Sequence, residues 1–318
     1  EIPLRLVGSE MCIRDSISTS FRFIASISTF DYYKKDKLFS RNDKPSFNSK
    51  DERFVKLMVA LPFLANKRAE FSLGYGQLED NYFQSSVIDF DKDRSDRSTY
   101  KLLGGSIGFY GSTLNTRQYA TKGYLEKLIA QVFTGRERFE PGNPQEGYSP
   151  SPQERQSWLQ ISYMKEAYHT MGPKFTLGWM AEALYSSKNF SENYTATMMQ
   201  AGEFAPTPHS KLMYNEAFRA NQYVAAGIKP IYVLNDMFQF RTEFYGFTPI
   251  FPIKKNALNK AYYGKAFSRF EYMGEVSVIC HLPFGAISAY VNHYSSPRRE
   301  WNVGMTIGWQ LFNYRFVE

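Results

Sequence analysis

The sequence predicts an all-β protein, a transmembrane antiparallel β-barrel of which about 12 strands are present. Three observations lead to this fold class. Strand candidates of about 12–16 residues are longer than the ~5–6 residues usual in soluble sheets. Their connections alternate between long and short along nearly the whole chain, as in outer-membrane barrels with long extracellular loops and short periplasmic turns. The last strand candidate, residues 301–312, also alternates strictly in polarity.

In this closing strand, one face is wholly apolar and the other is small or polar. The odd positions are Trp301, Val303, Met305, Ile307, Trp309 and Leu311, and the even positions are Asn302, Gly304, Thr306, Gly308 and Gln310. Successive side chains of a strand point to opposite faces, so the odd positions suit a lipid-facing surface. A half-buried strand of a soluble sandwich would show the same alternation. A sandwich, however, has no reason to sort its connections by length.

The other strand candidates show the same period of two, most clearly in residues 54–65 and 174–186. In chain order the candidates are residues 17–30, 54–65, 69–84, 100–113, 124–136, 155–169, 174–186, 219–234, 238–250, 266–280 and 286–294. Tight turns are expected at Asn66–Lys67, Met171–Pro173 and Asn235–Asp236. The longest irregular segment is residues 187–218.

The face opposite the apolar one is polar in the later strands, as the wall of a lumen would be. It carries Arg241 and Glu243 on one candidate strand and Glu271, Glu275 and Ser277 on the next. These side chains are therefore expected to point into the barrel.

Composition narrows the possible partners. The 318 residues carry a net charge of +7 and are 17% aromatic, which suits the aromatic girdles of a membrane barrel. Basic residues are scattered among acidic ones without a continuous stripe, so nucleic acid is not expected as a partner. Outer-membrane lipids and lipopolysaccharide are the expected partners of basic loops, with an ordinary solvated surface as the alternative. Only Cys12 and Cys280 occur, so no disulfide framework is predicted.

Residues 1–16 are interpreted as a separate segment. Met11–Ser16 reads MCIRDS, and one back-translation of it resembles the transposon-end adapter used in sequencing libraries. We therefore expect residues 1–16 to be an unstructured artefact and residues 17–318 to form the barrel domain.

Two kinds of catalytic motif occur in part but lack the context that their chemistry needs. Gly104–Gly108 satisfies G-x-S-x-G, but a nucleophile elbow needs a helix after the serine, and here a strand candidate continues past Ser106. The chain also contains no Asp-Gly dipeptide that could supply an aspartate partner for such a serine. The four histidines lack metal-ligand spacing. No catalytic residue, metal or cofactor is predicted for the chain itself.

From Tyr100 onward the sequence resembles the assembly-factor (bacterial surface antigen) superfamily, and within it the C-terminal barrel of bacterial patatin-like phospholipases. The stretches that carry the resemblance are STLNTRQYATKG (112–123), FRANQYVAAG (218–227), IKPIYVLND (228–236), FRTEFYGFTP (240–249), FEYMGE (270–275) and the final GWQLFN. The resemblance implies a 16-stranded barrel whose long sixth extracellular loop folds into the lumen. Residues 187–218 would be that loop, and the chain would hold about the last 12 strands.

The superfamily has an Arg-Gly-aromatic motif at the tip of that loop, whose arginine docks on the inner wall. Phe218-Arg219-Ala220 is the nearest match, with Ala where the family usually has Gly. The resemblance implies that Arg219 faces the lumen near Glu243 or another inward acid, with Arg241 in the same group. An ordinary interfacial arginine is the alternative.

The closing strand also fits the superfamily's assembly signal, which the barrel insertion machinery reads. Asn302, Gly304, Ile307 and Trp309 match its pattern, and chance matches in a lipid-facing strand are the alternative. In the family this strand pairs with the first strand. Here it is expected to end at an open seam or to be forced against residues 17–30.

The resemblance implies a non-catalytic barrel in the outer membrane of a Gram-negative bacterium. The barrel would anchor, and could translocate, an upstream patatin-like phospholipase domain. Two alternatives stay open at this point: an insertion or translocation factor of the same superfamily, and a general porin-like barrel.

Overall fold

The computed structural model describes residues 19–33, 47–84, 93–143, 154–282, 285–295, 301–308 and 315–317. The described part contains one 12-stranded antiparallel sheet in which sequence neighbours pair in order. Its strands are β1 (Ser20–Tyr33), β2 (Phe47–Leu64), β3 (Lys67–Tyr82), β4 (Asp96–Ser112), β5 (Gly123–Glu140), β6 (Glu154–Thr170), β7 (Phe175–Ser186), β10 (Gln222–Val233), β11 (Phe238–Pro249), β14 (Glu271–Leu282), β15 (Gly285–Tyr294) and β16 (Trp301–Gly308). The predicted fold class is confirmed. The expectation for residues 1–16 lies outside the described residues.

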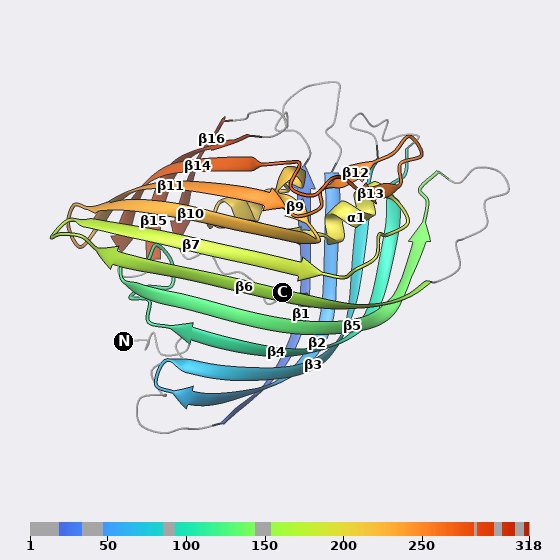
Figure 1. Cartoon of the computed structure of the whole chain (residues 1–318), viewed down its shortest axis with the longest axis horizontal. Coiled ribbons are helices and arrows are strands. Elements are labelled where there is room, and N and C mark those ends of the chain that lie inside the picture. The colour runs from blue at the N-terminus through green and yellow to red at the C-terminus, as the bar shows by residue number, and fades with distance from the viewer. Residues whose placement is uncertain are drawn as a thin grey trace.

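The sheet curls into an arc that encloses part of the chain (Figure 1). The helix α1 (Tyr194–Gln200), drawn in yellow, and the loop around it lie within this arc. Because neighbouring strands are antiparallel, successive connections lie at opposite ends of the sheet. The β7–β10 connection, which contains α1, therefore starts from the end opposite to the β4–β5 connection.

Alternation sorts the side chains of each strand into an outer apolar face and an inner face. The outer face exposes large apolar residues, among them Phe21, Phe23, Ile27, Leu57, Phe63, Leu73, Val132, Ile228, Phe244, Val303 and Ile307. The inner face is buried and holds aromatic residues together with charged ones. An outside that is apolar and an inside that is mixed is the pattern of a barrel in lipid, because only alternate residues meet hydrocarbon.

Glycine faces an aromatic ring on the neighbouring strand at several points of the inner face. Gly178 is opposite Tyr168, Gly227 is opposite Tyr245, and Gly304 is opposite Tyr290. At each glycine an added Cβ would collide with the opposite ring. The missing side chain lets the ring lie flat on the wall, which stabilises a strand position that glycine alone would weaken.

The structure corrects the prediction at three points in two connections. The expected strand 219–234 is divided: β9 (Arg219–Ala220) pairs with β8 (Gly202–Glu203) in a small separate sheet, and β10 follows. The connection between the expected strands 238–250 and 266–280 contains a hairpin of β12 (Ile253–Lys255) and β13 (Ala261–Tyr263). The long segment 187–218 contains α1, which begins at Asn193 because this side chain accepts a hydrogen bond from the backbone N–H of Ala196.

The seam of the sheet lies between β1 and β16. In the described part of the chain, β1 pairs with β2 alone and β16 with β15 alone. Of the two arrangements expected for the closing strand, the described strands show the open seam.

Candidate functional site

Two buried ion pairs lie side by side on the inner wall. Arg241 and Glu243, two residues apart on β11, have a nitrogen and an oxygen 2.9 Å apart, and both are almost fully buried. The hydroxyl of Tyr245 donates to the second oxygen of Glu243 at 2.7 Å. Lys229 on β10 and Glu166 on β6, two strands apart in the sheet, form a second pair at 2.9 Å. The lumen thus carries fixed charges whose burial is compensated by close partners.

The loop 187–218 enters the lumen and attaches first to the wall of β3 and β4. The amide of Asn193 donates to the hydroxyl of Tyr82 at 2.6 Å, and the hydroxyls of Ser191 and Tyr100 are 2.8 Å apart. Gln200, at the end of α1, donates to Asp80. The buried residues of α1 are Ala196, Thr197, Met198 and Met199. A helix buried in this way serves as a packed plug segment rather than as a surface helix.

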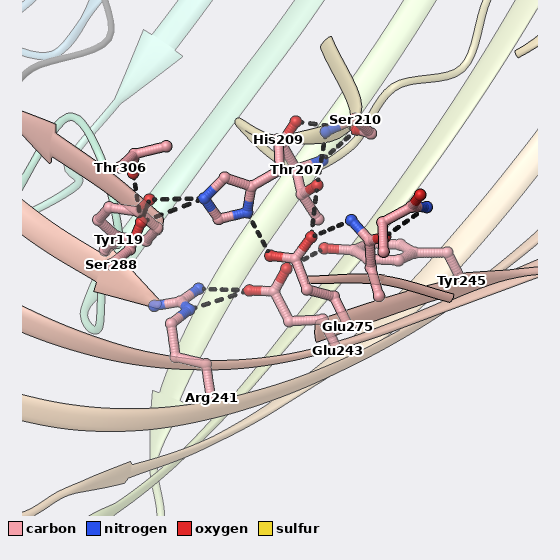
Figure 2. A network of polar contacts seen from close by, with 12 residues as sticks. Tyr119, Thr207, His209, Ser210, Arg241, Glu243, Tyr245, Glu275, Ser288 and Thr306 are labelled. Atoms are coloured by element: carbon pink, nitrogen blue, oxygen red, sulfur yellow. Dashed lines mark hydrogen bonds and ion pairs between the residues drawn. The ribbon is translucent and has the colours of Figure 1, made fainter. Parts of the chain in front are cut away.

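The same loop reaches the wall of β14 and β15 through His209 (Figure 2). The Nδ1 atom of His209 lies 2.8 Å from a carboxylate oxygen of Glu275, and its Nε2 atom lies 3.2 Å from the hydroxyl of Ser288. The hydroxyl of Thr207 donates to the other oxygen of Glu275 at 3.0 Å. The imidazole also stacks on Tyr290 at 3.5 Å between centroids. The loop is therefore tied to two separate stretches of the barrel wall.

A second insertion comes from the opposite end of the barrel. The β4–β5 connection, residues 113–122, carries Tyr119 into the network of Figure 2. The Tyr119 hydroxyl donates to Ser288 at 3.1 Å and lies 3.4 Å from Nε2 of His209. The carbonyl of the next residue, Ala120, accepts from Arg241 at 2.9 Å. Connections from both ends of the barrel thus meet at one histidine.

The backbone of this second insertion is built for a sharp turn. The side-chain oxygen of Asn115 accepts from the backbone N–H groups of Thr121 and Lys122, both at 3.0 Å. Tyr119 has φ +56°, in the left-handed region that non-glycine residues rarely adopt. Strained positions of this kind persist where the surroundings hold them and often mark functional sites.

Arg219 lies in the lumen, and the acid beside it belongs to its own loop. Its guanidinium is 2.8 Å from a carboxylate oxygen of Glu203, and the carbonyls of Met199 and Ala201 accept from it at 3.2 and 3.3 Å. Of the acids expected there, Glu243 or another inward acid, the structure pairs it with Glu203. The small β8–β9 sheet explains this pairing, because its register places Glu203 directly opposite Arg219. Arg219 thus fastens the end of its own loop to the middle of that loop, at residues 199–203, while Arg241 and Glu243 lie on the wall.

The expected closing-strand residues lie on β16 as far as it is described. Asn302 faces inward and donates to the side chain of Asn292 at 3.1 Å, and Gly304 lies opposite Tyr290. Ile307 is on the outer face and is 68% exposed, in line with a lipid contact. Trp309 lies outside the described residues.

The chain Glu275–His209–Ser288 has the connectivity of a charge relay, carboxylate to imidazole to hydroxyl. Catalysis would require the serine oxygen to reach a substrate carbonyl beside oxyanion donors. Ser288 is fully buried, and its oxygen already accepts from Tyr119 and contacts the hydroxyl of Thr306. In this enclosed setting the three groups tie the loop to the wall.

The rejected elbow serine also has a structural place. Ser106 lies in the middle of β4, and its hydroxyl is 2.6 Å from that of Ser72 on β3. Within the described residues, no group of His, Cys, Asp and Glu is arranged to hold a metal ion. No helix of the described part is long and apolar enough to cross a membrane.

His209 and Tyr119 were not predicted as functional residues. Both were present in segments that the sequence marked, one in the longest irregular stretch and the other in STLNTRQYATKG. His209 was considered as a metal ligand alone. A histidine and a tyrosine in connections from opposite ends give no joint signal in sequence, because only the curled sheet brings them together.

Comparisons with known proteins support the fold. Neither protein-family models nor curated protein sequences give a match. Among solved structures, the chain is similar to BamA from Haemophilus ducreyi lacking POTRA domains 1–3, with TM-score 0.52 and 11% identity over 91% of this chain. Autotransporter barrels also match: the β domain of Bordetella BrkA (TM-score 0.38, 10% identity, 90% of this chain and 95% of that one) and the transport unit of AIDA-I from Escherichia coli (0.38, 11%, 92% and 89%).

The match to BamA shows that the chain is a β-barrel of the bacterial outer-membrane type. The chain spans 57% of the length of that BamA chain. At 11% identity, the likeness concerns the fold alone.

Proposed function

We propose that the chain is the membrane part of a bacterial outer-membrane protein and anchors an attached patatin-like phospholipase domain. In this proposal its lumen is closed by the loop 187–218, which is bound to the barrel wall, and is not an open passage. The finer assignment is supported by the sequence stretches that resemble the barrel of patatin-like phospholipases, such as STLNTRQYATKG at residues 112–123. The chain itself has no catalytic role in this proposal.

The observation that favours an anchor over a pore is that the loop 187–218 crosses the lumen from one wall to the other. The loop 187–218 is bound to β3 and β4 at one side through Asn193 and Ser191. At the other side, His209 binds β14 and β15. A general porin would need a continuous polar channel, which a strap between two walls obstructs.

A reporter fusion tests the anchoring role. Residues 17–318 would be fused behind a periplasmic reporter enzyme and expressed in a Gram-negative host. The reporter is expected to fractionate with the outer membrane, and the barrel band is expected to shift on boiling before electrophoresis. A reporter recovered in the soluble periplasm would contradict the proposal.

Two further measurements separate the alternatives. A porin-like barrel would give large steady conductance in planar bilayers, whereas the strapped lumen is expected to give rare, brief openings. Hydrolysis of phospholipid or nitrophenyl ester by the purified chain would contradict the non-catalytic assignment, and no hydrolysis is expected.

An insertion or translocation factor is the second candidate function. The open seam between β1 and β16 favours it, because an unpaired strand edge can template another strand. Purified chain in liposomes would then accelerate the insertion of an unfolded barrel protein. Equal rates with and without the chain would favour the anchor.

A further inference from the structure

The inner wall of β3 and β4 contains a narrow slot floored by glycine. Gly74 and Gly76 on β3 and Gly104 on β4 leave it open, and we name these three residues the glycine slot. A Cβ added to them would lie 3.1, 3.0 and 3.4 Å, respectively, from the ring of Phe316. At Gly76 the two nearest atoms belong to that ring. The ring of Phe316 therefore occupies space that any larger residue would fill.

Aromatic and aliphatic side chains form the sides of the slot. Phe316 is only 2% exposed, and its ring centroid is 5.6 Å from that of Phe54 and 5.7 Å from that of Phe133. The other buried members of the same cluster are Leu78, Tyr100, Leu102 and Trp158. Tilted rings at this spacing are favourable aromatic contacts, so the slot selects a flat apolar group.

A polar contact next to the ring adds a second point of attachment. A guanidinium nitrogen of Arg315 lies 3.4 Å from a carboxylate oxygen of Glu203. The other oxygen of Glu203 binds Arg219, so the carboxylate is already held in place by its loop. The side chain of Arg315 remains 40% exposed, which makes this contact weaker than the ring contact.

The attachment is not a continuation of the sheet. β16 ends at Gly308, whose neighbour is Ala286 on β15. Arg315–Val317 instead contacts β2, β3, β4 and β5, at the other edge of the strand order. These residues belong to no strand and are held by their side chains: the ring of Phe316, the cation of Arg315, and Val317, which packs against the same cluster.

We propose that the glycine slot is a binding site for an aromatic side chain of an extended peptide with a neighbouring cation. In the structure the chain's own Arg315–Val317 occupies this site as a built-in ligand. The site goes beyond the anchoring role, because it gives the lumen a defined peptide chemistry. Removing the ring of Phe316 frees the slot for a peptide of the same chemistry added in trans.

A labelled peptide tests the site. The probe is the synthetic hexapeptide NYRFVE, which copies residues 313–318, and its binding to detergent-solubilised chain is followed by fluorescence anisotropy. The wild-type chain is expected not to bind it measurably, since its slot is filled. F316A is expected to bind it about tenfold or more tightly than the peptide NYRAVE, as the transfer of one phenylalanine ring from water implies.

Matched variants keep the test specific. F63A removes an outward phenylalanine that is 51% exposed, and this variant is expected to bind no peptide. The double variant F316A/G76L fills the slot from the wall and is expected to lose binding. Equal binding of NYRFVE and NYRAVE by F316A, or no binding of either, would overturn the proposal.

Photo-crosslinking gives a second test that leaves the slot filled. Benzoylphenylalanine at position 316 is expected to crosslink to peptides of β2 and β5, which contain Phe54 and Phe133. Crosslinks confined to other strands or to detergent would mean that the ring does not occupy the slot, and would overturn the proposal.

Discussion

Arg219 keeps its charge inside the barrel because several partners surround its guanidinium. Glu203 balances the charge, two backbone carbonyls accept hydrogen bonds from it, and the ring of Tyr214 lies 4.6 Å away. A buried ion pair adds little net stability, but the loss of one partner leaves an uncompensated charge. Arg219 therefore fixes the geometry of the loop more than it strengthens the fold.

Replacing Arg219 should loosen the loop. R219A is expected to lower the free energy of unfolding by about 3 kcal/mol, the low end for a broken buried pair, because Arg315 still lies near Glu203. Urea unfolding in detergent, followed by heat-modifiable mobility, measures the change. R219K retains the charge and should lose less. A stability of R219A equal to that of wild type would show that the pair does not hold the loop.

Lys188 shows the opposite balance among the loop cations. Its ammonium lies 4.7 Å from the ring of Tyr100 and 4.8 Å from the ring of Trp158, and the side chain is almost fully buried. Burial lowers the pKa of Lys188 from 10.5 to about 8, although the carboxylates of Glu137 and Asp80 oppose the shift. Desolvation of the ammonium is therefore the largest influence on this pKa.

The pH dependence of stability follows from this lowered pKa. Below pH 8 the lysine is charged in both states, and the folded chain bears the full cost of burying it. Between about pH 8 and 10.5 the unfolded chain binds more protons, so stability rises with pH. Over this pH window, the free energy of unfolding of wild type is expected to rise relative to that of K188M. If the free energy of unfolding of wild type instead falls relative to that of K188M as the pH rises, the rings and carboxylates around Lys188 outweigh its desolvation.

At the scale of elements, the strands could be predicted and the content of the connections could not. A period of two is a local property, so Val303, Met305 and Ile307 identified an outer face from sequence alone, and all three are more than 60% exposed. The acid that pairs with Arg219 depends on the two-residue β8–β9 contact. Pairings across such short sheets have no periodic signal, so the sequence predicts an acid beside Arg219 without singling out Glu203.

The junction of the two inserted connections gives a prediction at the same scale. Burial raises the pKa of Tyr119 above 10, so its hydroxyl stays protonated and donates. Y119F removes the contacts of the Tyr119 hydroxyl with Ser288 and His209, which are worth about 1 kcal/mol. The variant should therefore raise the fraction of time that the barrel conducts in planar-bilayer recordings about fivefold. Y232F makes the same change on the outer face, where Tyr232 is 46% exposed, and should leave the openings unchanged. Equal traces for Y119F and wild type would show that the two connections do not close the lumen together.

At the scale of the whole molecule, the interior is filled from both ends. The loop 187–218 enters from one end and residues 113–122 from the other, and they meet at His209. Arg315–Val317 completes the filling at the wall of β2 to β5. Each insertion satisfies inward polar groups that a water-filled lumen would otherwise solvate. The inserted segments thus explain why inward charged residues such as Arg241 and Glu275 are buried rather than lining an aqueous channel.

At the seam, the inserted segments leave the backbone N–H and C=O groups at the outer edges of β1 and β16 without sheet partners among the described strands. In hydrocarbon, unpaired backbone groups cost several kcal/mol each, so β1 and β16 carry the least stable backbone among the described strands. Hydrogen exchange in detergent should show the amides of β16 exchanging faster than those of β11, which has neighbours on both sides. Protection of β16 equal to that of β11 would mean that a strand covers its free edge in solution. Repeating the exchange over a range of chain concentrations would distinguish β1 from a second copy, because protection by a second copy rises with concentration.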